Sequence, residues 1–275
     1  MTTHLVDGLR WEVRVRGQRD AASLLLLHGF TGRATSWAEH ADAFARRFRL
    51  VTVDLPGHGR TGTADPARMS VERTADDLAA IVEGLDAAPA HVLGYSFGAR
   101  IALRLAAAHP EAVARLVLES PSAGIADPAE RAARAVEDDA LATRIERDGI
   151  AAFVDEWERR PAFASHAATL TAARAERQRA LRRANRPDGL AASLRGAGQG
   201  AMEPLFDRLA AVTAPTLVLT GPLDTVGRPR AERVAAGIPG ARIAVVDGAG
   251  HTPHEEQPLA FRRLALAFLE EDPAA

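Results

Sequence analysis

Short hydrophobic runs recur along the chain, and each ends in turn residues. An alternating segment at 11–15 is followed by continuous apolar runs at 24–29, 50–57, 91–96, 115–120, 215–221 and 242–248. Such runs are typical of strands buried on both faces, as in parallel sheets covered by helices. Helical patterns lie between several of them, at 70–85 with Ser70 as N-cap, and at 99–110, which stops at a proline. The pattern predicts an α/β fold with a mostly parallel central sheet.

This alternation stops between residues 125 and 208. The segment contains no β-like run, and its sequence is rich in Ala, Arg and Glu, which favours helices. An insertion at this point would lie over the carboxyl ends of the strands, where open α/β sheets bind ligands. We therefore predict a core formed by residues 1–124 and 209–275, with a helical cap, residues 125–208, inserted after the sixth strand.

Composition narrows the class of protein. The formal net charge of the 275 residues is −2, which gives no electrostatic reason to expect nucleic acid or an anionic membrane as partner. The chain has no Cys, which excludes disulfides, thiolate metal sites and cysteine nucleophiles. All 34 basic residues are Arg, so only the placement of an Arg is informative. The N-terminus contains no secretory apolar segment, and we expect a cytoplasmic protein.

A serine between two glycines, in "GYSFG" at 94–98, lies between a β-like run and a helix. This context is typical of the nucleophile elbow, a tight strand-to-helix turn that exposes the Ser96 hydroxyl. The "HGF" at 28–30 follows an earlier run, in the loop that supplies one amide of the oxyanion hole in this architecture. We predict a hole formed by the amides of Phe30 and Phe97, with His28 as a structural brace of the loop.

The partners expected for Ser96 lie near the C-terminus, in the chain order Ser, Asp, His. His251 stands on a glycine-rich turn after the last run, and Asp224 follows the run at 215–221. Other acids could replace Asp224, and two further histidines fit structural or surface positions better (Asp247 and Glu119; His58 and His254). Such a triad could serve acyl transfer, or remove a carbon-bound proton while the hole holds an enolate.

Arg100 lies one helical turn after Ser96, on the same helix face. Its guanidinium can point back toward the elbow, because helical side chains lean toward the N-terminus. This helix is expected in the interior, where an unpaired guanidinium is costly. A substrate carboxylate, bound through two hydrogen bonds, is a natural partner.

From "LLLLHGFTG" to "GAGHTPHEEQP", the chain resembles the 2-succinyl-6-hydroxy-2,4-cyclohexadiene-1-carboxylate synthases of menaquinone biosynthesis, lyases of the α/β-hydrolase fold. The elbow and triad are shared with many hydrolases. More specific are "GYSFGAR", "LVLESPSAGI" followed by "ERAAR", "EWERRPAFAS", and "RRAN" before "GLAASLRG". The chain departs from the family pattern at Ala99, where a glycine is usual, and in "TVGRPR" after Asp224, where a Lys-Phe pair is usual.

The resemblance implies a role for each matching residue. Ser96, Asp224 and His251 would form the triad, flanked by Tyr95 and Arg100. Arg134 and Trp157 would reach down from the cap, although Arg131 shares the helix of Arg134 and Trp157 would also suit the apolar core of the cap. The third substrate arginine of the family falls on Arg182, with Arg183 and Arg179 as neighbouring alternatives.

The resemblance also implies the reaction, a carbon–oxygen lyase step. Pyruvate would be eliminated from 2-succinyl-5-enolpyruvyl-6-hydroxy-3-cyclohexene-1-carboxylate, an anion whose three carboxylates match three arginines. No metal or organic cofactor would be needed, and the protein would be a monomer or small homo-oligomer. Two alternatives stay open. One is a serine hydrolase of the same fold, acting on a carboxylated ester or on a carbon–carbon bond of a ring-fission diketone, and the other is an inactive binding protein.

Overall fold

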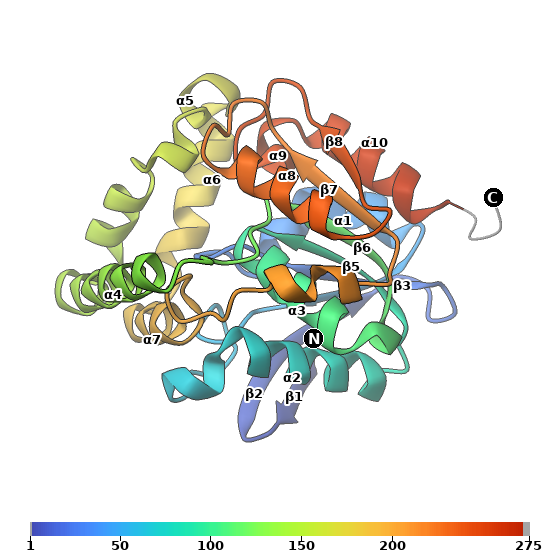
Figure 1. The fold of residues 1–275 in the computed structure, drawn as a ribbon, viewed down its shortest axis with the longest axis horizontal. Coiled ribbons are helices and arrows are strands. Elements are labelled where there is room, and N and C mark those ends of the chain that lie inside the picture. The colour runs from blue at the N-terminus through green and yellow to red at the C-terminus, as the bar shows by residue number, and fades with distance from the viewer. Residues whose placement is uncertain (1, 272–275) are drawn as a thin grey trace.

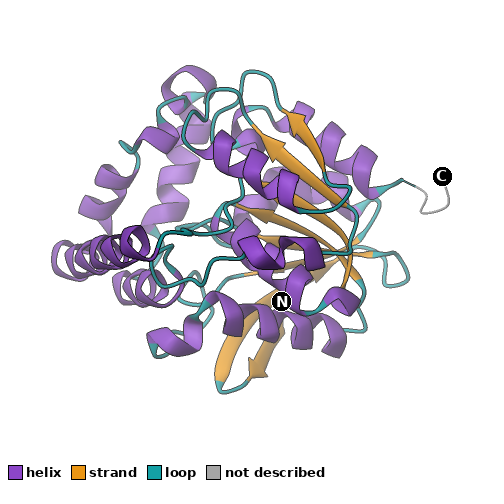
Figure 2. Cartoon of the chain, viewed as in Figure 1, coloured by secondary structure: helices purple, strands orange, loops and turns teal. Residues whose placement is uncertain are grey.

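A computed structural model describes residues 2–271 and shows one eight-stranded sheet flanked by helices (Figures 1 and 2). The strand order across the sheet is β1-β2-β4-β3-β5-β6-β7-β8. The strands are β1 (Thr2–Val6), β2 (Leu9–Arg16), β3 (Ser23–Leu27), β4 (Arg49–Val53), β5 (Ala90–Tyr95), β6 (Val113–Glu119), β7 (Thr216–Thr220) and β8 (Arg242–Val245).

The sheet is mostly parallel, as the sequence predicts. From β4 across to β8 every neighbouring pair is parallel, while β2 is antiparallel to both β1 and β4. The carboxyl ends of β3, β5, β6 and β7 therefore meet at one edge. This edge carries the loops in which the sequence places its candidate site residues.

Helices cover both faces of the sheet, and one strand shows why. In β3 all five residues are buried, with Leu25 and Leu27 in one hydrophobic cluster and Leu24 and Leu26 in another. Because side chains alternate along a strand, the two pairs point to opposite faces. The first face packs on α2 (Val71–Gly84), α3 (Phe97–Ala108) and α8 (Gly227–Gly237), the second on α1 (Ala38–Ala45) and α10 (Pro258–Leu269).

The two helices predicted from periodicity are present. Helix α2 begins after Ser70, whose side chain accepts a hydrogen bond from the Arg73 amide, the interaction expected of an N-cap. Helix α3 begins at Phe97, two residues before the predicted start, and ends at Ala108, before the proline. Its early start places Ser96 at the N-cap position.

The strand predictions need correction at the two edges of the sheet. Strand β1 was not predicted, because its five residues form a short edge hairpin with β2 whose side chains are mostly exposed. Strand β8 is present but is not buried on both faces. Among the described strands it pairs only with β7, and Ile243 and Val245 remain 43% and 39% exposed. An apolar run does not reveal whether its strand is central or at an edge.

Between β6 and β7 every regular element is a helix. We call α4 to α7 the cap helices: α4 (Pro128–Trp157), α5 (His166–Thr169), α6 (Ala172–Arg183) and α7 (Pro187–Ala197). They lie together beyond one end of the sheet, at the left in Figure 1, where α4 packs against α7. Across residues 2–271, no helix is both long and apolar enough to cross a membrane.

Candidate active site

Ser96 lies on a strained turn between β5 and α3. Its φ is +49°, in the left-handed region that few residues other than glycine adopt. The turn is possible because the residues two before and two after Ser96 are glycines. A Cβ on Gly94 would collide with the carbonyl of Gly98, and one on Gly98 would collide with the carbonyl of Leu27. The sequence therefore forms the sharp turn that a nucleophile elbow requires.

The structure brings Ser96, His251 and Asp224 into one hydrogen-bonded chain. His251 Nε2 lies 3.1 Å from Ser96 Oγ, and His251 Nδ1 lies 2.6 Å from Asp224 Oδ2. Burial favours the neutral carboxyl of Asp224, but the hydrogen bond and charge of His251, the Gly227 amide and Arg230 outweigh it, so its pKa is lowered. An ionised Asp224 fixes the His251 tautomer that leaves Nε2 free to accept a proton.

The two alternative acids do not reach His251. Glu119 is fully buried and binds His254 instead, with its Oε1 2.8 Å from His254 Nδ1. Burial opposes a charge on His254, but Glu119 and Glu255 outweigh it and raise its pKa to about 10. Asp247 is exposed on the loop after β8. His254 thus has the structural position that the sequence suggested for it.

Glu256 holds the loop that carries His251. Its Oε2 accepts hydrogen bonds from the two backbone amides that flank this histidine, Gly250 N at 2.8 Å and Thr252 N at 3.0 Å. Its other oxygen accepts from hydroxyls of the cap, those of Ser165 and Thr169. The carboxylate therefore ties the cap to the backbone on both sides of the candidate base, a link that sequence spacing does not reveal.

The amides of Phe30 and Phe97 are positioned as candidate donors to an oxyanion. Phe97 is the first residue of α3, so its N–H has no partner within the helix. Phe30 follows β3 and lines the same cavity as Ser96. Within residues 2–271 neither amide donates a backbone hydrogen bond. Both remain free for a ligand, and the Phe30 and Phe97 rings pack edge to face at 6.3 Å.

Two buried histidines brace the loop that carries Phe30. His28 Nε2 accepts the Leu55 amide at 2.9 Å, while its Nδ1 donates to the Gly29 carbonyl. His58 Nε2 accepts the Thr31 amide at 3.2 Å, so this histidine contacts the residue directly after Phe30. Each ring is thus held as a neutral imidazole. The bracing role predicted for His28 matches these contacts, and His58 shares it.

This bracing predicts a stability that declines in acid. Burial, the largest cause, lowers the pKa of His28 to about 4 and that of His58 to about 3. The unfolded chain would bind these protons near pH 6.5. The contribution to stability is therefore complete above that pH and is lost as the pH falls toward 4, by about 1.4 kcal/mol per pH unit for each histidine.

Urea unfolding at pH 7, 6 and 5 measures this slope. His58→Gln should reduce the pH dependence of the free energy of unfolding by the contribution of one histidine. His4→Gln, on edge strand β1, should leave this pH dependence unchanged. An equal slope in wild type and His58→Gln would show that His58 is not buried in its neutral form.

A cavity of about 360 Å³ opens beside Ser96 and His251, between the sheet and the cap helices. Its wall includes four of the five residues predicted to bind substrate, Tyr95, Arg100, Arg134 and Trp157, together with Phe30. Trp157 lines the cavity and also packs on the Phe30 ring, with 5.3 Å between the ring centres. Its indole N–H is buried without a partner in the described chain.

Arg100 is buried, with 8% of its surface exposed. Its guanidinium lies over the Phe97 ring, 5.1 Å from the centroid, and one nitrogen donates to the Ala197 carbonyl at the end of α7. Burial lowers its pKa to about 10, and repulsion by Arg134 contributes. The side chain stays cationic at neutral pH, and it faces the cavity without a carboxylate bound to it in the described chain.

Arg134, rather than Arg131, lines the cavity from α4. Its Nε donates to Asp138 at 2.8 Å, one turn along the same helix, which leaves its two terminal nitrogens free of hydrogen bonds within residues 2–271. Arg131 instead donates to the Ile125 carbonyl near the start of the helix.

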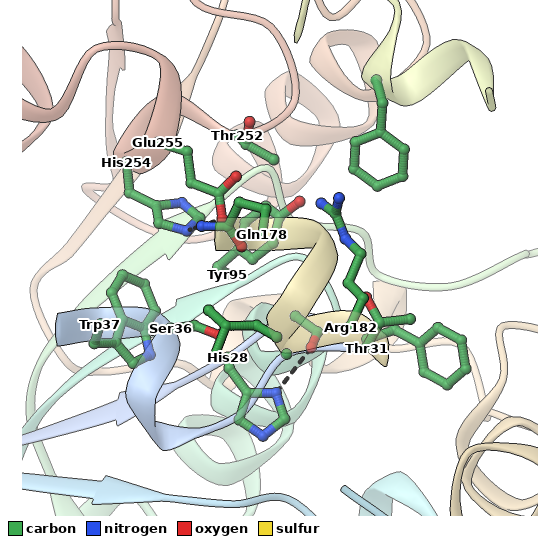
Figure 3. A pocket seen from close by; sticks show the side chains of 15 residues that line it. His28, Thr31, Ser36, Trp37, Tyr95, Gln178, Arg182, Thr252, His254 and Glu255 are labelled. Carbon is green, nitrogen blue, oxygen red and sulfur yellow. Dashed lines mark hydrogen bonds and ion pairs between the residues drawn. The ribbon is translucent and has the colours of Figure 1, made fainter. Parts of the chain in front are cut away.

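Arg182 does not line this cavity. It lies on the wall of a separate pocket of about 30 Å³, together with Tyr95, Thr252 and Glu255 (Figure 3). Its guanidinium donates to Glu158 at 2.8 Å. The neighbouring alternatives are ion-paired to the same end of α4, Arg179 with Glu158 and Arg183 with Asp155. The structure therefore brings none of these three candidate arginines to Ser96.

Two cavity arginines were missed by the sequence analysis. Arg160 enters the wall three residues after Trp157, and Arg230 enters it from α8. Arg160 lies within the quoted segment "EWERRPAFAS", but nothing in the letters distinguishes it from Arg159. Arg230 lies in the "TVGRPR" segment that departs from the family pattern. Which arginines line the cavity depends on how the cap helices pack over the sheet, and the sequence does not show this packing.

The family model, the curated relatives and the solved structures that match this chain agree on its fold. Residues 22–258 match the family described as alpha/beta hydrolase fold. A protein of Bacillus subtilis (strain 168) named putative 2-succinyl-6-hydroxy-2,4-cyclohexadiene-1-carboxylate synthase is 37% identical over 264 residues, which is 96% of each chain. A solved structure described as MenH from S. aureus has a TM-score of 0.89 at 30% identity, covering 94% of this chain and 97% of that one. A thermophilic esterase from Thermogutta terrifontis, solved with malate bound, has a TM-score of 0.85 at 26% identity, covering 98% and 96%.

Proposed function

The chain belongs to the alpha/beta hydrolase fold family, among relatives named 2-succinyl-6-hydroxy-2,4-cyclohexadiene-1-carboxylate synthase, and we propose that it catalyses the pyruvate elimination that forms this compound. The substrate would be 2-succinyl-5-enolpyruvyl-6-hydroxy-3-cyclohexene-1-carboxylate. The enzyme would thus be a carbon–oxygen lyase of menaquinone biosynthesis.

One observation carries the proposal beyond the family name. The cavity that holds Ser96 and His251 is also lined by Arg100, Arg134 and Arg160, while within residues 2–271 the only buried carboxylate among these arginines is that of Asp138. A hydrolase of neutral esters has no use for such an excess of positive charge at its cavity wall. A substrate with three carboxylates would offset it through charge-assisted hydrogen bonds.

The reaction can be followed from the substrate formula. The ring carbon C2 lies between the succinyl carbonyl and the C3–C4 double bond, and the enolpyruvyl ether is on C5. Removal of the C2 proton forms an enolate. Its electrons then make the C2–C3 double bond, the C3–C4 pair shifts to C4–C5, and the C5–O bond breaks. Pyruvate leaves as its enolate and takes up a proton.

Each step has a candidate group in this chain. Ser96 Oγ would take the C2 proton as His251 Nε2 takes the hydroxyl proton, and Asp224 would stabilise the resulting imidazolium. The Phe30 and Phe97 amides would bind the enolate oxygen of the succinyl group. His251 would then return a proton to the departing pyruvate. Every proton is accounted for, and no covalent bond to the protein forms.

The second candidate is a serine hydrolase that acts on a carboxylated ester or a carbon–carbon bond. The same Ser96–His251–Asp224 geometry favours it, and so does the fold shared with an esterase. A hydrolase would attack a carbonyl with Ser96 and pass through an acyl-enzyme, with a burst of the first product. The two proposals therefore differ in the role of Ser96 Oγ, which transfers a proton in the lyase and attacks a carbonyl in the hydrolase.

The test of the proposed function is turnover of the substrate named above. The purified protein, with a chelator present, should release pyruvate and form the conjugated diene in a one-to-one ratio at equal rates, because a single bond cleavage yields both. Pyruvate is measured with a coupled dehydrogenase and the diene by its ultraviolet absorbance. The proposal fails if pyruvate release does not exceed the rate without enzyme while simple esters are hydrolysed at about 10 s⁻¹, a typical enzyme rate.

A further inference from the structure

Arginine side chains crowd one wall of the cavity. Burial lowers the pKa of Arg160, and repulsion by Arg134 lowers it further, whereas the charge of Glu156 raises it. Burial and repulsion by Arg134 lower the pKa of Arg100 in the same way. The carboxylate between them is that of Asp138, which already accepts the Arg134 Nε and the Gly200 amide. Two carboxylates, those of Asp138 and Glu156, therefore lie near three guanidinium groups, and positive charge is in excess at this wall.

The guanidinium of Arg160 is positioned but weakly engaged. It lies 4.4 Å from the centre of the Trp157 ring, and its side chain is 34% exposed. The nearest carboxylate oxygen, Glu156 Oε1, is 4.0 Å away and accepts a hydrogen bond from Arg144 at 3.2 Å. Within residues 2–271, Arg160 makes no side-chain hydrogen bond. Its N–H groups at the cavity wall are therefore free for a ligand.

Arg182 is in the opposite situation. Its side chain is 8% exposed, its guanidinium is paired with Glu158 at 2.8 Å, and it lies 5.1 Å from the centre of the Phe163 ring. The pocket beside it, of about 30 Å³, has room for one or two waters but not for a substrate carboxylate with its ring (Figure 3). The positive charge of Arg182 is already matched inside the protein.

We propose that Arg160, together with Arg134, binds a carboxylate of the substrate on the cap side of the cavity, and that Arg182 holds the cap instead of contacting substrate. This inference rests on the proposed function for the nature of the substrate. Stacking on Trp157 limits the motion of the Arg160 side chain, so little freedom is lost on binding. Its planar fork can make the two parallel hydrogen bonds that a carboxylate accepts.

Binding of a stable dianion tests the assignment without turnover. The probe is 2-succinylbenzoate, which has a succinyl and a ring carboxylate, and calorimetry gives its Kd for the full chain. Arg160→Gln should raise Kd about tenfold, and Arg160→Lys should recover part of the loss. Arg159→Gln is the matched control, because Arg159 is the adjacent arginine, is exposed and does not line the cavity. It should leave Kd within about twofold.

The two monomethyl esters of the probe identify the carboxylate. Affinity for the ester that lacks the contacted carboxylate should be insensitive to Arg160→Gln, while affinity for the other should fall as for the dianion. Arg182→Gln should lower the melting temperature but leave Kd unchanged. The proposal would be overturned if Arg182→Gln raised Kd without altering the melting temperature while Arg160→Gln bound the probe like wild type. It would also be overturned if wild type showed no saturable binding of the probe.

Failure of the proposed function would look different. A chain that binds the dianion through Arg160 but releases no pyruvate would retain this carboxylate site and lose the lyase assignment. A chain that releases pyruvate with Arg160→Gln at the wild-type kcat and KM would retain the lyase and lose the site.

Discussion

Ser96→Ala, His251→Ala and Asp224→Asn are each expected to lower kcat/KM by about 10⁴-fold or more. The three side chains form one hydrogen-bonded unit, with 3.1 Å between Ser96 and His251 and 2.6 Å between His251 and Asp224. Loss of any member removes the proton path, and an amide at position 224 would favour the wrong tautomer of His251. Because the members act together, the double variant Ser96→Ala with His251→Ala should be little worse than either single one.

A stability control separates catalysis from folding. Ser70→Ala removes the cap of α2 and should lower the free energy of unfolding by about 1 kcal/mol while leaving kcat/KM unchanged. The triad variants should show the reverse, with wild-type melting and severe kinetic loss. If His251→Ala retained nearly the wild-type rate, the base would have to be another residue.

Arg100→Ala and Arg134→Ala are expected to cost about 2–5 kcal/mol each in kcat/KM for the anionic substrate, as when one partner of a buried charge pair is removed. The loss should be larger for Arg100, which is nearly fully buried, than for Arg134, whose side chain is 28% exposed and more screened. Lysine at either position should recover only part, because an ammonium cannot make two planar hydrogen bonds.

Neutral esters provide the comparison for these arginines. The arginine variants should retain any turnover of such an ester, since the ester has no carboxylate that could pair with Arg100 or Arg134. Arg100 also donates to the Ala197 carbonyl, so its variants need a melting curve to show that the contact between α3 and α7 survives. Equal losses on the neutral ester and on the anionic substrate would mean that both residues support structure, and the lyase proposal would lose its main support.

Local sequence determined the parts of this fold that depend on near neighbours. The apolar runs identified the central strands, Ser70 marked the start of α2, and the glycines around Ser96 predicted the turn. The edge strands were harder, because burial depends on how many partners a strand has. Strand β1 was missed and β8 was predicted to be more buried than it is.

Long-range packing decided which arginines reach the cavity. In sequence Arg160 and Arg182 are both cap arginines near aromatic or amide residues. They differ in their partners, since Glu158 faces α6 and pairs with Arg182, whereas the carboxylate nearest Arg160 is shared with Arg144. Glu256 shows the same limit, since its hydroxyl partners in the cap are about 90 residues away in the chain. No spacing rule relates such distant segments.

In the proposed reaction, Ser96 transfers a proton and does not become acylated. Intact-mass analysis of enzyme quenched during turnover of 2-succinyl-5-enolpyruvyl-6-hydroxy-3-cyclohexene-1-carboxylate tests it most directly. We expect one species at the mass of the unmodified chain at every time point, while pyruvate accumulates without a burst. An adduct on Ser96 that forms and decays at the rate of turnover would contradict it and identify the protein as a serine hydrolase.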